Sequence, residues 1–177
     1  MQRIIVTGAT SMIGVALIEE CIKHGTEVYA VVREGSEKRS RLPESSLIKF
    51  VDCSLEHLDR LPEMIPQECD TFYHIAWGNT GENRNSSTER QSRNIGYTLA
   101  AVKAAAALGC KRFIGAGSQA EYGLLDLDRI SPESAANPTT PYGAAKLASG
   151  YLARMLCREL GIECIWPRIF SVYGIYE

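Results

Sequence analysis

Residues 3–14 read R-I-I-V-T-G-A-T-S-M-I-G. The run at 3–7 is short and apolar, which is typical of a buried parallel strand. Gly8 ends that run, and the apolar residues after it recur at helical spacing. A strand that turns at a glycine directly into a helix leaves free backbone N–H groups and the positive end of the helix dipole at the turn. The stretch therefore predicts a strand–turn–helix unit that could bind a phosphate group.

The rest of the chain alternates strand-like and helical segments in the same way. Strands are expected at 3–7, 27–32, 47–51, 71–76, 111–116 and 163–170, the last interrupted at Pro167. Helices are expected at 12–24, at 94–108 with Asn94 as the N-cap, and at 142–160. This alternation favours the α/β class, with a Rossmann-like doubly wound parallel sheet, helices on both faces and the strand order 3-2-1-4-5-6.

The composition is that of one packed globular domain. The 177 residues are 45% hydrophobic and 23% charged, and the net charge is −2. Without a basic excess no nucleic-acid partner is expected, and the apolar runs are too short to span a membrane. The six cysteines lack close pairs and the three histidines lack ligand spacing, so no metal site is expected. Free thiols and the absence of a leader pattern favour a cytoplasmic location.

The turn at 7–14 reads T-G-A-T-S-M-I-G. Glycines at such a turn let the backbone approach a pyrophosphate closely. Ser11 occupies the middle position of a G-x-x-G-x-x-G spacing. Its Cβ would crowd a phosphate there, although its hydroxyl could donate a hydrogen bond instead. Taken alone, the motif is compatible with dinucleotide binding or with an ordinary strand-to-helix turn.

A basic cluster follows the second strand. That strand ends V-V-R-E at 31–34, and three further basic residues occur before position 42. An Asp or Glu at this point is typical of NAD binding, because it contacts the ribose 2′-hydroxyl, whereas an Arg suits the 2′-phosphate of NADP. Arg33 therefore favours NADP(H) as the preferred cofactor, and Glu34 keeps NAD(H) open. A solvated charged loop is the competing interpretation.

Two further motifs carry side chains suited to acid–base chemistry. Tyr142 and Lys146 are four residues apart, which places them on one face of the expected helix. A nearby ammonium favours the ionised form of a phenol, so the tyrosine could act as acid or base. Ser118 follows the fifth strand, where a hydroxyl could hydrogen-bond a substrate carbonyl. A chance Tyr–Lys pair and a turn serine are the competing interpretations.

Taken in order, these segments resemble the extended short-chain dehydrogenase/reductases, and among them the nucleotide-sugar epimerase/dehydratase group. The resemblance covers essentially the whole chain. It rests on the T-G-x-x-x-x-x-G turn, on Asp52 after the third strand, on D-T-F-Y-H-I-A at 70–76 and on G-S-Q-A-E-Y-G at 117–123. The segments P-Y-G-x-x-K at 141–146 and P-R-I-F-S-V-Y-G at 167–174 complete it.

The resemblance implies an NAD(P)-dependent enzyme acting on a nucleotide-sugar, with Ser118, Tyr142 and Lys146 as catalytic residues. Tyr142 would be the acid/base for a sugar hydroxyl or ketone, and Ser118 would polarise that oxygen. Lys146 would assist Tyr142 and bind the nicotinamide ribose. Together with the arguments above, the expected cofactor contacts are Gly8, Thr10, Ser11, Met12, Ile13, Gly14, Arg33, Asp52, Cys53, Ile75, Ala76, Trp77, Lys146 and Pro167.

The chain departs from the family pattern after Ser118. Dehydratases of the family carry an Asp-Glu pair directly after that serine, and here the pair is Gln119-Ala120. Glu121 is displaced by one residue and is not expected to substitute. The resemblance therefore implies 4-keto reduction or epimerisation by hydride transfer rather than elimination.

Family members also continue into a smaller C-terminal substrate domain, which would be largely absent from residues 1–177. We therefore expect a single NAD(P)-binding domain with an uncovered pocket wall and exposed apolar surface. A non-catalytic redox-sensing module and a reductase of a non-sugar carbonyl remain alternatives. Arg84, Arg90 and Arg93 could meet a diphosphate. The resemblance also allows a homodimer through the helices at about 94–108 and 142–160.

Overall fold

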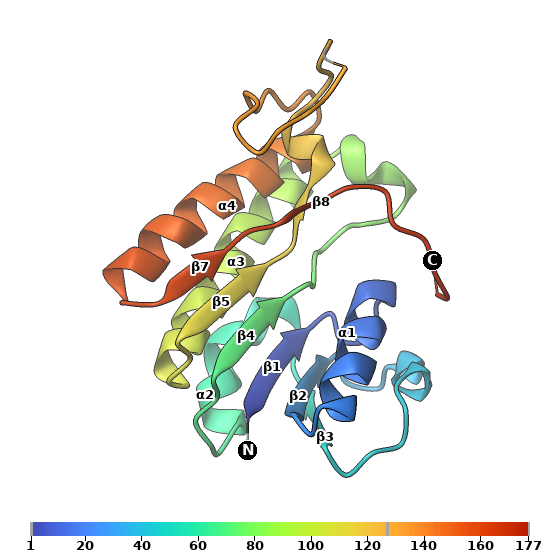
Figure 1. The fold of residues 1–177 in the computed structure, drawn as a ribbon, viewed down its shortest axis with the longest axis vertical. Helices are drawn as coiled ribbons and strands as arrows, with labels where there is room; N and C mark the ends of the chain where they lie inside the picture. The colour runs from blue at the N-terminus through green and yellow to red at the C-terminus, as the bar shows by residue number, and fades with distance from the viewer. Residues whose placement is uncertain (1, 127, 177) are drawn as a thin grey trace.

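The computed structural model describes residues 2–126 and 128–176. Their centre is a six-stranded parallel sheet with the order β3-β2-β1-β4-β5-β7. All six strands point the same way, so their carboxyl ends meet at one edge (Figure 1). Since β7 is the sixth expected strand, the predicted order is confirmed. The strands are β1 (Arg3–Thr7), β2 (Glu27–Val32), β3 (Ile48–Asp52), β4 (Thr71–His74), β5 (Arg112–Gly115) and β7 (Glu163–Ile165).

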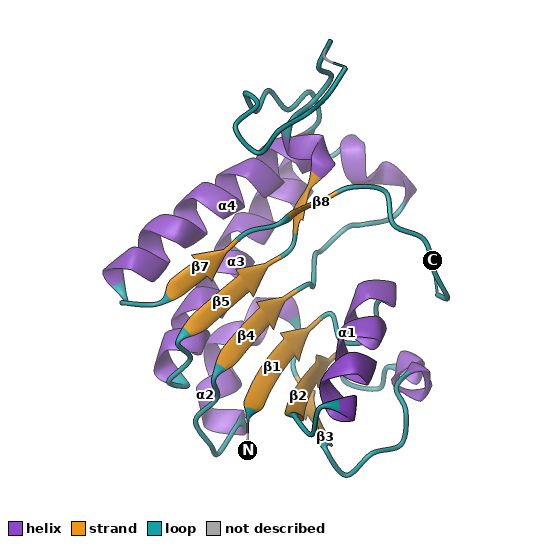
Figure 2. Ribbon diagram, in the orientation of Figure 1, coloured by secondary structure: helices purple, strands orange, loops and turns teal. Residues whose placement is uncertain are grey.

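Helices cover both faces of the sheet (Figure 2). On one face α1 (Met12–Lys23) packs Val15 and Ile18 against the alternate residues of β1 and β2. On the other face α2 (Leu61–Met64), α3 (Thr88–Ala107) and α4 (Pro141–Glu159) enclose a second core around Phe72 and Phe113. Short 3-10 helices form η1 (Glu37–Arg41), η2 (Leu55–Arg60), η3 (Glu82–Asn85) and η4 (Gln119–Glu121). In the described part of the chain, no helix is long and apolar enough to cross a membrane.

The predicted start of the helix at 94–108 was wrong. Helix α3 begins at Thr88, and its N-cap is Ser87, whose hydroxyl accepts the backbone N–H of Arg90. Asn94 lies inside the helix and is 1% exposed. The polar residues at 88–93 hid this first part of the helix, because they do not show an apolar period. Asn94 is therefore not an N-cap. Its buried side-chain amide instead holds the loop after β4, as described below.

The sixth expected strand is divided at Pro167, which has no backbone N–H to donate to a neighbouring strand. Residues before it form β7 in the main sheet, whereas β8 (Arg168–Ile169) pairs with β6 (Gly117–Ser118) in a separate two-stranded sheet. Beyond β8 the chain runs across the carboxyl edge of the main sheet toward α1 (Figure 1). The side chains of Val172, Tyr173 and Ile175 are exposed along this segment.

Candidate active site

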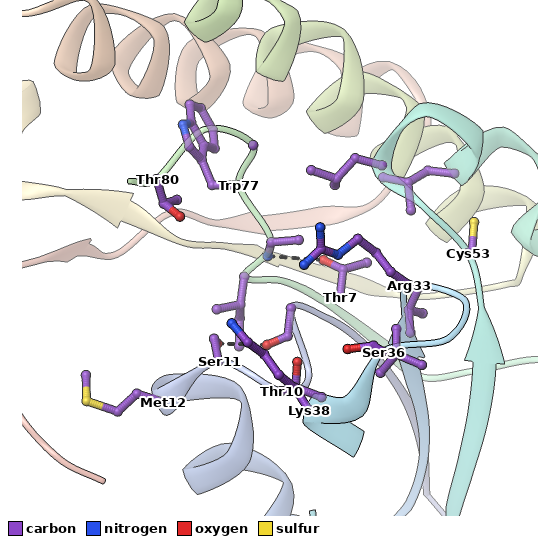
Figure 3. Close-up of a pocket in the computed structure, with 18 of the residues that line it drawn as sticks. Thr7, Thr10, Ser11, Met12, Arg33, Ser36, Lys38, Cys53, Trp77 and Thr80 are labelled. Atoms are coloured by element: carbon purple, nitrogen blue, oxygen red, sulfur yellow. Dashed lines mark hydrogen bonds between the residues drawn. The ribbon is translucent and has the colours of Figure 1, made fainter. Parts of the chain in front are cut away.

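A cavity of about 610 Å³ opens at the carboxyl ends of β1, β2 and β4 (Figure 3). This is the edge at which ligands bind in doubly wound sheets. Of the expected cofactor contacts, those that line the cavity are Gly8, Thr10, Ser11, Met12, Arg33, Cys53, Ile75, Ala76 and Trp77. Those outside its lining are Ile13, Gly14, Asp52, Lys146 and Pro167. Nine of the fourteen expected cofactor contacts therefore lie around one cavity.

The turn between β1 and α1 is packed so tightly that two of its glycines are sterically required. Gly8 has a φ of +71°, and a Cβ there would lie 2.7 Å from the backbone nitrogen of Ala76. A Cβ on Gly14 would lie 2.2 Å from the carbonyl oxygen of Gly8. The glycines therefore bring the turn against the loop after β4 and close it onto the first turn of α1. This narrow backbone cradle fits a pyrophosphate group at a helix N-terminus.

Ser11 is part of the turn itself. Its Oγ donates to the carbonyl oxygen of Gly8 at 2.7 Å and accepts the backbone N–H of Gly14 at 3.1 Å. It is thus the N-cap of α1. The hydroxyl proton of Ser11, which could have bonded to a phosphate, is donated within the turn instead. Ser11 instead stabilises the cradle from within, which is a role that glycine could not fill.

The end of β2 gives the cavity a basic wall. Arg33, Lys38 and Arg41 line it, and Glu56 is the one carboxylate in its described lining. Glu34 faces a separate cavity of about 380 Å³, which Asp52 also lines. No Asp or Glu of β2 lines the main cavity. The positive charge of this wall therefore suits an anionic group near Arg33.

Two expected contacts have other partners. Asp52, expected beside an adenine, forms an ion pair with Arg39. Pro167 lines a third cavity of about 420 Å³, together with Arg168 and Phe170. Both residues follow or end strands near the carboxyl edge of the sheet, and neither lines the main cavity.

Lys146 is buried behind the wall of the main cavity, with only 4% of its surface exposed. Its Nζ donates to the carbonyl oxygen of Ala116 at 2.6 Å and lies 3.7 Å from the centre of the Trp77 ring. Burial lowers the pKa of Lys146 to about 7, while the charge of Glu121 acts in the opposite direction. Lys146 is therefore an ammonium that loses its proton near neutral pH.

Tyr142 lies in the first turn of α4, where it meets two cations. The Lys146 Nζ is 5.9 Å from its ring centre, and the guanidinium carbon of Arg84 is 5.1 Å away. The Trp77 ring stands perpendicular to it at a centroid distance of 6.0 Å. The structure thus brings the predicted tyrosine and lysine together, and it adds Trp77 and Arg84 to the group.

Ser118 and Glu121 belong to one compact motif at η4. The Ser118 Oγ accepts the backbone N–H of Ala120, and Glu121 Oε1 accepts the backbone N–H of Ser118 at 2.9 Å. Glu121 is 1% exposed and also accepts from Trp166 and Arg168. Its carboxylate therefore joins η4 to the segment at 166–168, and Glu121 does not line the main cavity.

His74, at the end of β4, forms a buried polar network beneath the turn. Its Nδ1 lies 2.9 Å from the hydroxyl of Thr7, and its Nε2 lies 3.5 Å from the hydroxyl of Thr98. Thr98 donates its own proton to Asn94, so it can accept from Nε2 of a neutral imidazole. Burial, assisted by the charge of Lys146, lowers the pKa of His74 to about 3.

Two amides of α3, missed by the sequence reasoning, hold the loop after β4. Gln91 accepts the indole N–H of Trp77 at 2.8 Å and donates to the carbonyl oxygen of Asn79. Asn94 accepts the backbone N–H of Gly78 at 2.6 Å and donates to its carbonyl oxygen. Both amides are buried and lie one helical turn apart. Ser87, with Glu89 in the first turn after it, was the sequence signal that the helix starts before Gln91 and Asn94.

Comparison with known proteins places this geometry in context. The model of the NAD dependent epimerase/dehydratase family matches residues 4–177. The UDP-glucose 4-epimerase of Streptomyces lividans is 23% identical over 171 residues, which are 96% of this chain and 52% of that protein. The dTDP-6-deoxy-L-talose 4-dehydrogenase (NAD(+)) of Aggregatibacter actinomycetemcomitans is 27% identical over 145 residues, which are 82% and 52% of the two proteins.

The fold comparison agrees. The crystal structure of UDP-glucuronic acid 4-epimerase from Bacillus cereus in complex with NAD matches with a TM-score of 0.79 and 22% identity, covering 99% of this chain and 59% of that one. At this identity the match shows the fold. The chain spans about half the length of the curated relatives it matches.

Proposed function

The chain belongs to the NAD dependent epimerase/dehydratase family, and on that premise we propose that it is the cofactor-binding and proton-transfer part of an NADP(H)-using enzyme that acts on a nucleotide-sugar. The reaction is 4-keto reduction or epimerisation at a sugar carbon by hydride transfer. One observation carries the proposal: Tyr142 and the buried Lys146 contact Trp77, which lines a cavity that also contains the glycine turn after β1.

The cavity has the features that a nicotinamide dinucleotide requires. The turn at Gly8 and Gly14 is the place for the pyrophosphate, because a Cβ would fill either position. Arg33, with its basic neighbours, is the place for the 2′-phosphate that distinguishes NADP(H). NAD(H) is the alternative, since the family is NAD dependent. When bound, the dinucleotide supplies the acceptor or donor of the hydride.

Residues of this chain transfer the proton of the sugar hydroxyl. Tyr142 takes the proton from the sugar hydroxyl as its carbon loses a hydride, and it returns a proton to the carbonyl oxygen in the reverse direction. Lys146 and Arg84 place their basic groups within 6 Å of the centre of the Tyr142 ring. Ser118 orients the reacting oxygen by donating its hydroxyl proton, while one lone pair of that hydroxyl accepts the N–H of Ala120.

The same region supports reduction or epimerisation over elimination. An elimination needs a second acid–base pair beside the sugar, and the positions after Ser118 are Gln119 and Ala120. Glu121 is committed to Trp166 and Arg168. Proton transfer at Tyr142 is therefore the chemistry that these residues favour.

The test measures two products after the chain is mixed with UDP-glucose and oxidised dinucleotide. Reduced nicotinamide is followed by its absorbance, and the 4-epimer of the nucleotide-sugar is followed by chromatography, because epimerisation regenerates the oxidised dinucleotide. We expect turnover in the wild type and a loss of about 100- to 10,000-fold in Tyr142→Phe with dinucleotide affinity retained. Tyr151→Phe, which alters an exposed tyrosine of the same helix, is the matched control and should keep the wild-type rate. Equal rates in the two variants would contradict the role of Tyr142. Tight dinucleotide binding with no turnover on any nucleotide-sugar would favour the redox-sensing module instead.

A further inference from the structure

Trp77 lines the cavity and also contacts two side chains that do not line it. It follows β4, and its indole points away from the turn that carries Ser11, toward the helices above (Figure 3). One face of the indole meets the ammonium of Lys146 at 3.7 Å, and the ring also contacts Tyr142. The same side chain lines the cavity. It therefore touches both proton-transfer side chains and the space in front of them.

The contact between the Trp77 ring and Lys146 is close enough to stabilise the charged form of the lysine. A cation within about 6 Å of an aromatic ring is attracted to the ring face, and tryptophan is the strongest partner. Lys146 is almost fully buried, and its one hydrogen bond among the described residues runs to the carbonyl of Ala116. An ammonium removed from water in this way needs such a face to remain charged, because burial favours the neutral amine.

The indole is also fixed in place. Its N–H donates to Gln91, which is 0% exposed and is itself tied to the carbonyl oxygen of Asn79. Asn94 clamps the next residue of the loop, Gly78, through both its donor and its acceptor. A ring held at its nitrogen and at the following peptide cannot turn away from Lys146 without breaking these buried contacts.

We propose that Trp77 is a positioning residue: its indole face holds the ammonium of Lys146 in place beside Tyr142. The role rests on the proposed function, because it gives the wall of the dinucleotide cavity a direct contact with the proton-transfer pair. The charged and titratable groups around Lys146 are Glu121 from η4, His74 from β4 and Tyr142 from its own helix, with Arg84 beyond Tyr142. The Lys146 Nζ lies 3.7 Å from the centre of the Trp77 ring, which is nearer than its 5.9 Å distance to the centre of the Tyr142 ring.

The first test needs no catalysis. The field of an ammonium on the indole face changes tryptophan emission, so the fluorescence of the chain should titrate with Lys146 between pH 5 and 9, with a midpoint near its pKa of about 7. Lys146→Met and Trp77→Phe should each abolish this transition. Lys103→Met, which removes an exposed lysine of α3, should keep it. Circular dichroism of each variant establishes that it is folded.

Either of two results would overturn the proposal. One is a flat emission profile in the folded wild type. The other is an unchanged transition in folded Lys146→Met, because the titrating group would then be another residue. Dinucleotide binding is measured separately by calorimetry, so a chain that shows the transition but binds neither NADPH nor NADH would refute the proposed function while leaving the contact intact.

A second test separates positioning from simple lining of the cavity. In the dinucleotide-loaded chain, Trp77→Leu should lower kcat by about 100-fold, with a much smaller change in the dinucleotide Kd. Trp77→Phe should recover most of that loss, because phenylalanine retains a ring face for the ammonium. A loss confined to the dinucleotide Kd, with kcat unchanged, would mean that Trp77 only lines the cavity.

Discussion

Lys146 and His74 are two basic side chains that the fold buries within reach of each other's charge. Burial lowers the pKa of both, because each charged form loses its hydration. Lys146 retains partial compensation from the Ala116 carbonyl and the Trp77 ring, whereas His74 is satisfied as a neutral imidazole between two threonine hydroxyls. Strongly shifted groups of this kind concentrate at functional sites.

The shift of His74 makes the stability of the chain sensitive to acid. Its pKa is about 3 in the folded chain and 6.5 in the unfolded chain, so between these values the unfolded state binds more protons. The free energy of unfolding should therefore fall as the pH is lowered from about 6.5, with a slope from this residue of up to about 1.4 kcal/mol per pH unit. Urea unfolding at a series of pH values measures that slope.

The matched variants isolate the residue responsible. His74→Gln keeps a neutral hydrogen-bonding side chain, and we expect it to lose most of the slope between pH 6.5 and 5. His57→Gln changes an exposed histidine and should retain the wild-type slope. If His74→Gln and the wild type lost stability in parallel over this range, His74 would not be the buried neutral base described above.

The turn between β1 and α1 is the element on which the cavity depends. Ser11 closes the turn by bonding to both glycines that flank it, and the carbonyl of Gly8 lies where a side chain at position 14 would have to be. The contacts that close this turn are thus the same contacts that shape the proposed phosphate cradle. A change that opens the turn should therefore weaken stability and ligand binding together.

Gly14→Ala tests this coupling directly. The added Cβ meets backbone and not a flexible side chain, so we expect destabilisation of about 1–3 kcal/mol together with the loss of dinucleotide binding. Gly96→Ala is the control, because Gly96 is in α3 and a Cβ there meets nothing within 4 Å. That variant should be as stable as the wild type, or up to about 1 kcal/mol more stable. Normal dinucleotide affinity in Gly14→Ala would contradict the cradle.

The sequence predicted elements well where one physical pattern dominated. The strand order followed from apolar strands alternating with helices, and Tyr142 met Lys146 because a spacing of four fixes one helix face. Prediction was weaker where tertiary contacts decide. The polar start of α3 hid Gln91 and Asn94, whose amides are buried by the loop that they hold. Asp52 was assigned to the cavity, but its ion pair with Arg39 depends on how η1 folds back.

The cavity has basic side chains on one side and, on the other, Trp77, which contacts the proposed proton-transfer pair. Arg33 follows β2, Lys38 is in η1, and Trp77 follows β4 (Figure 3). Lys146 reaches Trp77 from α4. The glycine turn stands between Arg33 and Trp77 at the end of β1. An extended molecule with a phosphate-bearing end, a central diphosphate and a reactive end would match that order. Binding of a dinucleotide along this edge is therefore the central prediction for this chain.

Calorimetric titration of the chain with NADPH, and separately with NADH, is the most direct test of that claim. We predict one site per chain and tighter binding of NADPH, with the difference reduced about 10- to 100-fold in Arg33→Glu, as expected for loss of a charge-assisted hydrogen bond. Tighter binding of NADH would contradict the role of Arg33 and leave the cavity assignment standing. The absence of binding by both dinucleotides to the folded chain would contradict the central claim itself.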